Sequence, residues 1–368
     1  MNTSSLLLLG IGRAGSSIAR GVSRAFGPGL RFTCADTDAL TGQPGGDFIL
    51  LGGERLAGRG TGCDLSLAKI ATEDSVSAID PYLEGVNVVA LVAGLGGGTG
   101  TAASLAILQH LRERGVTTIL FATTPFLFEG DERHRNARSM QPILEENADA
   151  SFFIPLDRLI SGEDNMELAM SRAVDTMASG ITLFWRLIEK PGYIAFDSEK
   201  MRAVIKTAGH GTFATISRSG FDRAGDIVEE LKKSNILSAS KDRTKSVVTG
   251  ILAGDDLRLS EVGTLANGVK EIFGTGASYE LATVNDESTF SGRISVVVMA
   301  FDSTRDGVSS KTNPSRHGGV SRNSASRKKS VLGYGNSKGI FAKTVPTLHN
   351  GEDLDTPTYL RQNITLEL

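Results

Sequence analysis

Short apolar runs alternate with helix-like patterns along the first 160 residues. The apolar runs that predict strands are Leu6–Leu9, Leu30–Ala35, Asn87–Ala93, Thr117–Ala122 and Ala150–Ile154. Helical patterns lie between them at Ser16–Ala25, Asp64–Asp80, Thr101–Arg114 and Glu132–Glu146. The apolar runs are continuous rather than alternating, which is typical of strands buried on both faces. The first part of the chain is therefore predicted to be α/β, with a Rossmann-like parallel sheet.

A single long helical pattern follows, from Asn165 to Glu189, and it ends at Lys190-Pro191-Gly192. A cation followed by two helix breakers is a typical helix end. Beyond it, strands are predicted at Phe213–Arg218, Ser246–Ala253, Ser278–Val284 and Arg293–Phe301, and helices at Ala224–Ser234 and Ser260–Phe273. This second part is predicted to be an α+β domain with a mixed sheet.

The composition changes after Phe301. Between Asp302 and Asn350 the chain is rich in Ser, Gly and Asn, and nine basic residues face only Asp302 and Asp306. Few residues there could build a core, so this segment is predicted to be a disordered basic linker. The predicted divisions are residues 1–164, a central helix at 165–190, a second domain at 191–302, the linker at 303–350 and a terminal peptide at 351–368.

Charge and apolar content narrow the range of partners. The net charge of −3 over 368 residues gives no general attraction to nucleic acid. No apolar run reaches the roughly 20 residues that cross a bilayer, so we expect a cytoplasmic protein that reaches membranes only through a partner. Cys34 and Cys63 fit no metal spacing and no disulfide framework, and we interpret them as small buried thiols.

Two glycine-rich segments each follow a predicted strand and precede a predicted helix. The first, Gly10–Ser16, matches the dinucleotide fingerprint, and Asp36 and Asp38 lie about 20 residues further on, where a ribose-binding acid would sit. By itself this loop fits a nicotinamide-dependent dehydrogenase as well as any other nucleotide-binding protein.

The second segment, Gly94–Thr101, has five glycines in its first seven residues. Without side chains, consecutive backbone N–H groups can surround an anion, and the threonine hydroxyls could also donate. No Gly-Lys-[Ser/Thr] follows, so it is not a Walker loop. Two such loops on neighbouring strand ends favour a polyphosphate held from both sides, which a dehydrogenase does not need.

Gly94–Thr101 closely resembles the signature Gly-Gly-Gly-Thr-Gly-[Ser/Thr] of the tubulin/FtsZ superfamily. The resemblance continues in order from Leu6 to Arg361. The terminal segment Leu354–Arg361 resembles the tail motif of FtsZ, which tubulin lacks, so the FtsZ branch is preferred. Asp36–Ala39, Leu56–Gly60 and Pro125–Gly130 with Arg133 resemble further nucleotide loops of that branch.

The resemblance implies binding of GTP or GDP with Mg²⁺. In FtsZ the matching Glu contacts the ribose, the Arg lies near the nucleotide and the Asp of the long helix binds the guanine edge. The implied nucleotide-binding residues are Gly12, Arg13, Ala14, Gly15, Ser16, Asp38, Gly60, Gly96, Gly97, Gly98, Thr99, Gly100, Thr101, Glu129, Arg133 and Asp175. Ser16, Leu156 and Met170 replace the Asn, Asn and Phe that FtsZ usually has.

In FtsZ, hydrolysis occurs between subunits, and two acids in the loop after the long helix reach the neighbour's nucleotide. Asp197 matches the first acid, while Ala195 replaces an Asn and Lys200 replaces the second acid. A lysine cannot accept a proton as a carboxylate does. Glu199 could substitute after a one-residue shift. Two expectations therefore stand: a GTPase with Asp197 and Glu199 as catalytic residues, or a filament protein with weak or absent hydrolysis.

The same resemblance implies an assembly and a place in the cell. FtsZ polymerises head-to-tail into the division ring, and its tail binds membrane tethers such as FtsA and ZipA. For this chain it implies self-association, a tether bound through Asp353–Arg361, and a place at the cytoplasmic division site. Residues 1–164 would then bind GTP, and residues 191–302 would complete the neighbour's catalytic site.

Overall fold

The computed structural model forms two units, Met1–Ser310 and Lys311–Leu368. The residues that it describes are 6–42, 47–159, 165–189, 192–195, 203–206, 208–238, 240–302, 348–349 and 352–353. In the second unit, β11 (Leu348–His349) pairs antiparallel with β12 (Glu352–Asp353). The two strands lie on either side of the predicted boundary between linker and terminal peptide.

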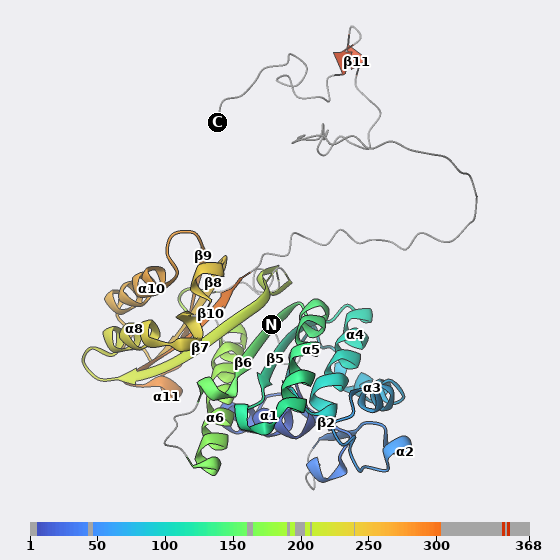
Figure 1. Cartoon of the computed structure of the whole chain (residues 1–368). Helices are drawn as coiled ribbons and strands as arrows, with labels where there is room; N and C mark the ends of the chain where they lie inside the picture. The colour runs from blue at the N-terminus through green and yellow to red at the C-terminus, as the bar shows by residue number, and fades with distance from the viewer. Residues whose placement is uncertain are drawn as a thin grey trace. The chain divides into compact units, whose positions relative to one another are not determined.

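The first unit contains one ten-stranded mixed sheet with the order β3-β2-β1-β4-β5-β6-β7-β10-β8-β9 (Figure 1). Its strands from β3 to β7 are parallel, β10 is antiparallel to both neighbours, and β8 and β9 are parallel. The strand bounds are β1 Leu6–Ile11, β2 Phe32–Asp36, β3 Phe48–Leu50, β4 Val88–Gly94, β5 Thr117–Thr124, β6 Ala150–Pro155, β7 Gly209–Ser219, β8 Ser246–Ala253, β9 Ser278–Asn285 and β10 Arg293–Phe301. The α/β prediction with a mixed second part is confirmed.

The two parts of the sheet join through a pairing that the sequence did not predict. β7 begins at Gly209, four residues before the predicted strand, and its first residues pair with β6. Gly211 lies so close to the rings of Phe152 and Phe301 that a Cβ would lie 2.7 Å from Phe301 Cδ1. Glycine is a poor strand former, and therefore propensity alone places the strand start too late.

The helices follow the predicted pattern with a few differences. The principal helices are α1 Gly12–Phe26, α3 Leu65–Glu73, α4 Ser104–Glu113, α5 Asp131–Asn147, α6 Met166–Glu189, α8 Arg223–Lys233 and α10 Leu259–Phe273. The helix predicted over Asp64–Asp80 ends early, and a 3-10 segment, η3 (Val76–Leu83), replaces its second half. Pro81 lies in that segment and cannot donate an N–H to an α-helical ladder. Shorter helical segments are α2 Gly53–Leu56, η4 Thr99–Ala103, η5 Leu127–Glu129, η6 Leu156–Arg158, α9 Asn235–Ser238 and α11 Glu287–Phe290.

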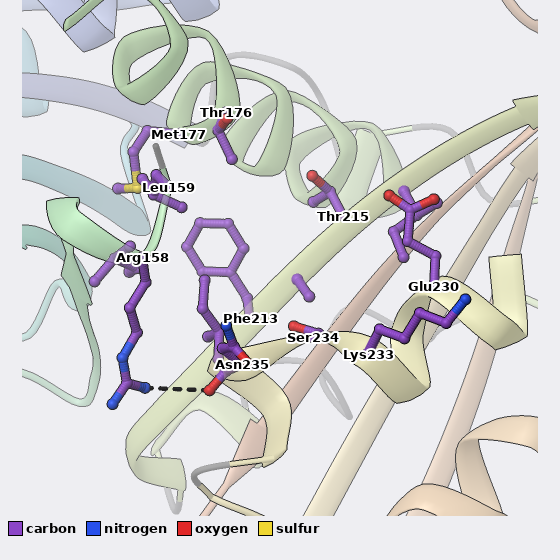
Figure 2. Close-up of a pocket in the computed structure, with 14 residues that line it drawn as sticks. Arg158, Leu159, Thr176, Met177, Phe213, Thr215, Glu230, Lys233, Ser234 and Asn235 are labelled. Atoms are coloured by element: carbon purple, nitrogen blue, oxygen red, sulfur yellow. Dashed lines mark hydrogen bonds between the residues drawn. The ribbon is translucent and has the colours of Figure 1, made fainter. Parts of the chain in front are cut away.

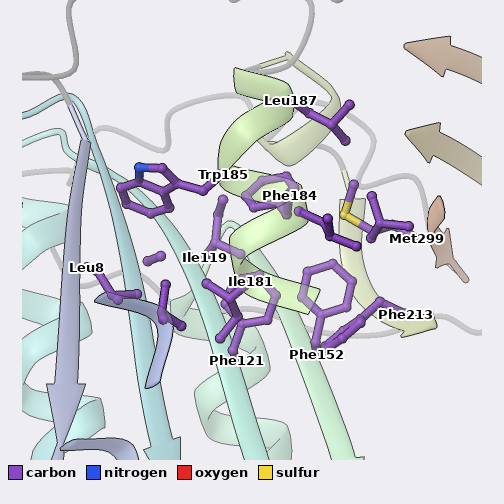
Figure 3. Close-up of a cluster of buried hydrophobic side chains, with 14 of the residues drawn as sticks. Leu8, Ile119, Phe121, Phe152, Ile181, Phe184, Trp185, Leu187, Phe213 and Met299 are labelled. Atoms are coloured by element: carbon purple, nitrogen blue, oxygen red, sulfur yellow. The ribbon is translucent and has the colours of Figure 1, made fainter. Parts of the chain in front are cut away.

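The central helix α6 packs against both parts of the sheet. One apolar cluster contains residues of α1, α6, the parallel strands and the strands β7, β8 and β10. Phe121 of β5 stacks on Phe152 of β6 with ring centroids 5.0 Å apart, and Phe213 of β7 meets both rings edge-on (Figure 3). A second cluster lies under α4 and α5, and a third joins α8 and α10 to β7, β8 and β10. Among the described helices, none is long and apolar enough to cross a bilayer.

Candidate functional site

The two glycine loops meet at the carboxyl ends of β1 and β4, which are neighbours in the sheet. Ile11 is the register partner of Ala93, so each strand ends at the same edge. Gly12 has φ +69°, and a Cβ there would lie 3.2 Å from the backbone N of Gly100. A Cβ on Gly94 would lie 2.6 Å from the Cβ of Ala14. The absence of side chains is therefore what lets the two loops touch.

Both loops lead into helices whose first turns have no side-chain cap. The residue before α1 is Ile11 and the residue before η4 is Gly98, and neither accepts a hydrogen bond through a side chain. By contrast, Asp64 caps α3 by accepting from the backbone N of Leu67 at 3.0 Å. The first N–H groups of a helix have no partner within it and carry partial positive charge. Two uncapped helix starts side by side form a cradle for an anion.

Gly97 and Gly98 of the second loop have different surroundings. Among the described residues, no atom lies within 4 Å of the position that a Cβ on Gly97 would occupy. A Cβ on Gly98 would lie 2.0 Å from Thr61 Oγ1 and 3.1 Å from the carbonyl oxygen of Asp64. The loop is thus packed against protein at Gly98 and open at Gly97. The open position is where a ligand can approach the backbone.

The threonine hydroxyls of the second loop hold the loop itself. Thr99 Oγ1 lies 2.6 Å from Thr37 Oγ1, and both side chains are buried. The backbone N of Gly96 donates to Thr101 Oγ1 at 2.8 Å. The sequence suggested donation to an anion, but these contacts give both hydroxyls a bracing role. Thr37 and Thr61 were not among the predicted site residues, because their contacts join loops that are far apart in the sequence.

The loop after β2 separates two acids that the sequence treated alike. Asp36 is 3% exposed, and its carboxylate accepts from the backbone N of Thr37 at 2.7 Å and from Thr41 Oγ1 at 2.6 Å. Asp36 is therefore committed to its own loop and is not available to a ribose. Asp38 pairs with Arg13 of the first loop at 3.0 Å. The backbone of Asp38 also pairs with that of Arg59 in an isolated antiparallel β-bridge. This pairing brings Gly60 next to the loop after β2.

Glu129 and Arg133 form an ion pair beside the second loop. Arg133 Nη1 lies 2.7 Å from Glu129 Oε2, and the other oxygen, Oε1, accepts from the backbone N of Phe126 at 2.9 Å. A Cβ on Gly96, which has φ +104°, would lie 2.9 Å from the Cβ of Arg133. The start of α5 is therefore packed onto the glycine loop. Both predicted residues lie at the edge of the cradle.

Gly15, Gly100 and Ser16 lie inside the site rather than on its surface. A Cβ on Gly15 would lie 2.1 Å from the carbonyl oxygen of Val92, and one on Gly100 would lie equally close to that of Gly94. The hydroxyl of Ser16 is buried and has no hydrogen-bond partner among the described residues. Beneath it, burial raises the pKa of the Cys34 thiol, which therefore stays protonated.

Asp175 lies on α6, apart from the contacts that join the loops. Its side chain is exposed and accepts from Ser171 Oγ at 3.3 Å. The neighbouring Val174 and Ala178 face Gly21 of α1, where a Cβ would lie 3.2 Å from Ala178 Cβ. Met170, one turn earlier, is 47% exposed. Asp175 is thus held next to α1, with its carboxylate open to a ligand.

The predicted catalytic residues Asp197 and Glu199, together with Lys200, lie outside the described residues. The chain before them is described from Gly192 to Ala195, and Ala195 is exposed. In the described part of the chain, no three His, Cys, Asp or Glu side chains converge on a point that could hold a metal ion.

A cavity of about 310 Å³ lies away from the glycine loops, between α6, the end of β6, β7 and α8. Figure 2 shows Phe213 at its centre, with Met177 and Leu159 on one side and Glu230 and Thr215 on the other. Its lining includes no predicted nucleotide-binding residue. The cavity is therefore separate from the cradle.

Comparison with known proteins decides the family. Residues 5–162 match the model of the tubulin/FtsZ family GTPase domain. The chain is 30% identical over 315 residues to the cell division protein FtsZ of Rickettsia conorii. The aligned region covers 82% of this chain and 68% of that protein. This chain belongs to the tubulin/FtsZ family. It is also 28% identical over 290 residues to FtsZ of Pseudomonas aeruginosa, covering 77% and 74% of the two chains.

The tubulin/FtsZ fold is found in solved structures as well. The empty FtsZ dimer of M. jannaschii superposes with a TM-score of 0.74 at 24% identity, over 81% of this chain and 88% of that one. Both glycine loops lie inside the matched GTPase domain. The dehydrogenase interpretation is therefore set aside. The chain belongs to another family, the side chain of Asp36 is hydrogen-bonded within its own loop, and the two glycine loops form one site.

The chemical groups of the cradle suit a nucleoside triphosphate. It offers two uncapped helix starts, an open approach at Gly97, the exposed guanidinium of Arg13 and the buried hydroxyl of Ser16, which has no partner in the described part of the chain. A polyphosphate is the kind of ligand that two such helix starts suit.

Proposed function

We propose that this chain binds GTP across its two glycine loops and assembles head-to-tail into filaments that act in cell division. The observation that carries the proposal is the meeting of two uncapped helix starts around the open backbone of Gly97. Membership in the tubulin/FtsZ family supports guanine as the base. The empty FtsZ of M. jannaschii is a dimer, which supports self-association.

The residues of the cradle divide the work of binding. Backbone N–H groups of the first turns of α1 and η4 would hold the phosphates, and Gly12, Arg13, Ala14, Gly15 and Ser16 line one side. Gly96, Gly97, Gly98, Thr99, Gly100 and Thr101 line the other side. Glu129 would lie at the ribose, Arg133 near the nucleotide and Gly60 beside the terminal phosphate, while Asp38 would hold Arg13 of the first loop. Asp175 would accept two N–H bonds from guanine, which adenine cannot supply.

Mg²⁺ would neutralise charge on the phosphates of bound GTP. It commonly keeps several waters and is shared with substrate phosphates, which suits a site that has no described cluster of acidic ligands. Asp197, with Glu199 as a substitute for the second acid, would act on the nucleotide of the next subunit. Positioning and electrostatics would account for most of the rate in such a reaction.

Phosphate release measured against protein concentration tests this proposal. With GTP and Mg²⁺ present, release per subunit should rise cooperatively, because each site needs a neighbour, and electron micrographs should show filaments with GTP. Strictly proportional release at all concentrations would exclude shared sites. If the chain binds neither GTP nor GDP, the proposal as a whole is overturned.

The alternative is a filament protein that hydrolyses GTP slowly or not at all. It is favoured by Ala195 and Lys200, which replace an Asn and an acid of the family's catalytic loop. Under this alternative, Lys200→Asp should raise the turnover of assembled protein at least several-fold, since it restores a carboxylate. If the variant hydrolyses at the wild-type rate, the missing acid is not the defect.

The tail would give the filament its place in the cell. We propose that Asp353–Arg361 binds a membrane tether such as FtsA or ZipA, and that residues 303–350 are the basic linker to this peptide. The protein would then act at the cytoplasmic division site. Removing residues 352–368 should leave GTP affinity unchanged and abolish recruitment to the septum. Recruitment that survives the deletion would exclude the peptide.

A further inference from the structure

The chain that leaves the central helix is fastened to the last strand of the sheet. β9 is the terminal strand of the sheet, and β8 is its one partner among the described strands. On its other side, the backbone N of Gly192 donates to the carbonyl oxygen of Thr283 at 2.7 Å, and the backbone N of Thr283 donates to the carbonyl oxygen of Ile194 at 2.9 Å. The loop after α6 is therefore hydrogen-bonded to the sheet at a single residue of β9.

A third hydrogen bond at this point comes from a side chain. The backbone N of Ile194 donates to Thr283 Oγ1 at 2.9 Å. Thr283 is 2% exposed, so water does not compete effectively for this contact. One buried threonine thus holds both ends of the segment Gly192–Ile194 with its N–H, its carbonyl and its hydroxyl.

Gly192 is required at this contact because there is no room for a side chain. A Cβ there would lie 2.6 Å from the carbonyl oxygen of Thr283 and 2.7 Å from Asn285 Oδ1. The side-chain amide of Asn285 is itself buried and has no hydrogen-bond partner among the described residues. Tyr193, between the two anchored residues, is 82% exposed.

We propose that Thr283 is a positioning residue for catalysis, because it fixes the start of the loop that carries Asp197. This inference rests on the proposed function. Asp197 follows Ile194 by three residues, a span of about 10 Å when fully extended. The carboxylate of Asp197 must reach the nucleotide of a neighbouring subunit. Its position is better defined when Ile194 is held by Thr283 than when Ile194 is free to move. Misplacement of about 1 Å can cost a large factor in rate.

The test compares three variants with wild-type protein in filaments. Thr283→Val keeps the shape and both backbone bonds but removes the acceptor for Ile194, and Thr283→Ser restores a hydroxyl. Gly192→Ala introduces the Cβ that does not fit. Gly263→Ala is the matched control, since no atom lies within 4 Å of its added Cβ. For each variant the kcat and KM for GTP, the GTP affinity of unassembled protein and the hydrogen exchange of the Ile194 amide are measured.

Thr283→Val should lower kcat about fivefold and speed exchange at Ile194 by a similar factor, as loss of one hydrogen bond implies. KM, GTP affinity and the critical concentration for assembly should stay within about twofold of wild type. Thr283→Ser should recover most of the rate, Gly192→Ala should lose more than Thr283→Val, and Gly263→Ala should behave as wild type.

Two results overturn the inference. One is a Thr283→Val variant that exchanges faster at Ile194 yet hydrolyses at the wild-type rate. The other is a variant whose GTP affinity falls together with kcat, which would indicate a general defect of the fold. A wild-type chain that binds no GTP refutes the proposed function itself, and one that assembles but releases no phosphate is the alternative of a filament protein without hydrolysis. The two failures are therefore distinguishable.

Discussion

Gly97→Ala isolates the contribution of the open backbone to nucleotide binding. The added methyl group meets no protein atom within 4 Å, and the backbone of Gly97 does not adopt the left-handed conformation. The substitution should leave the free energy of unfolding within about 0.5 kcal/mol of wild type. If a phosphate lies against this backbone, the methyl group takes its place.

The structure allows the size of the effect to be worked out. A hydrogen bond from a backbone N–H to a charged group contributes about 1.5–3 kcal/mol. Its loss should raise the Kd for GTP by about 10-fold to 150-fold. Gly98→Ala is the informative comparison, because its Cβ would lie 2.0 Å from Thr61 Oγ1. Overpacking of this kind should destabilise the protein by about 1–3 kcal/mol in addition to weakening binding.

The assay pairs thermal unfolding of nucleotide-free protein with titration of a fluorescent GTP analogue. Gly276→Ala serves as control, since its Cβ also meets no atom within 4 Å and it lies in the loop before β9. A Gly97→Ala variant with wild-type affinity would show that the ligand does not pass against this backbone. Equal loss of stability in the Gly97 and Gly98 variants would show that the space at Gly97 is not open.

Three further substitutions test other parts of the structure. Asp175→Asn should reduce the preference for GTP over ATP in competition binding about tenfold, because an amide can accept only one of the two guanine N–H bonds. Arg186→Met should destabilise the protein by about 3 kcal/mol in denaturant unfolding, since it removes the guanidinium that pairs with the buried carboxylate of Asp286. The hydrogen bond from Arg223 holds the pKa of Glu261 below its ordinary value of 4.5, so this contribution to stability is complete above that pH and is lost as the pH falls through the lower folded-state pKa. Glu261→Gln should therefore flatten the acid side of the stability profile, and an unchanged slope would contradict the assignment.

Local patterns predicted most elements of the fold. The bounds of β8 and β10 agree with the apolar runs Ser246–Ala253 and Arg293–Phe301, because both strands are almost fully buried and their sequence is continuous. The early start of β7 was missed, because Gly211 packs against the rings of Phe152 and Phe301 and Gly209 pairs with Ala150 of β6, and strand propensity indicates neither contact. β3 (Phe48–Leu50) is too short to produce a readable run.

The candidate site was predictable as far as its chemistry is written in consecutive residues. Both glycine loops are contiguous motifs, and their positions at strand ends follow from the alternation of strands and helices. The contacts of Thr37 with Thr99 and of Thr61 with Gly98 join loops far apart in the sequence, and no local pattern indicates them. The hydrogen bonds that hold Asp36 in its own loop likewise have no sequence signal, since Asp36 and Asp38 are equivalent by spacing alone.

Arg186 gives the nucleotide cradle and the loop anchor a common support. Its guanidinium lies 3.2 Å from Asp286 Oδ2, 3.4 Å from the carbonyl oxygen of Phe26 and 5.1 Å from the ring centroid of Phe26. Phe26 ends α1, the helix that begins at Gly12 in the cradle, and Asp286 follows β9 three residues after Thr283. A helix of 15 residues is about 22 Å long and nearly rigid, so a displacement at its first turn also moves its last. Arg186 is 7% exposed and contacts both Phe26 and Asp286, so the end of α1 and the end of β9 meet at one buried side chain. The helix that begins in the cradle and the strand that fastens the loop after the central helix therefore share one packed contact, at the guanidinium of Arg186.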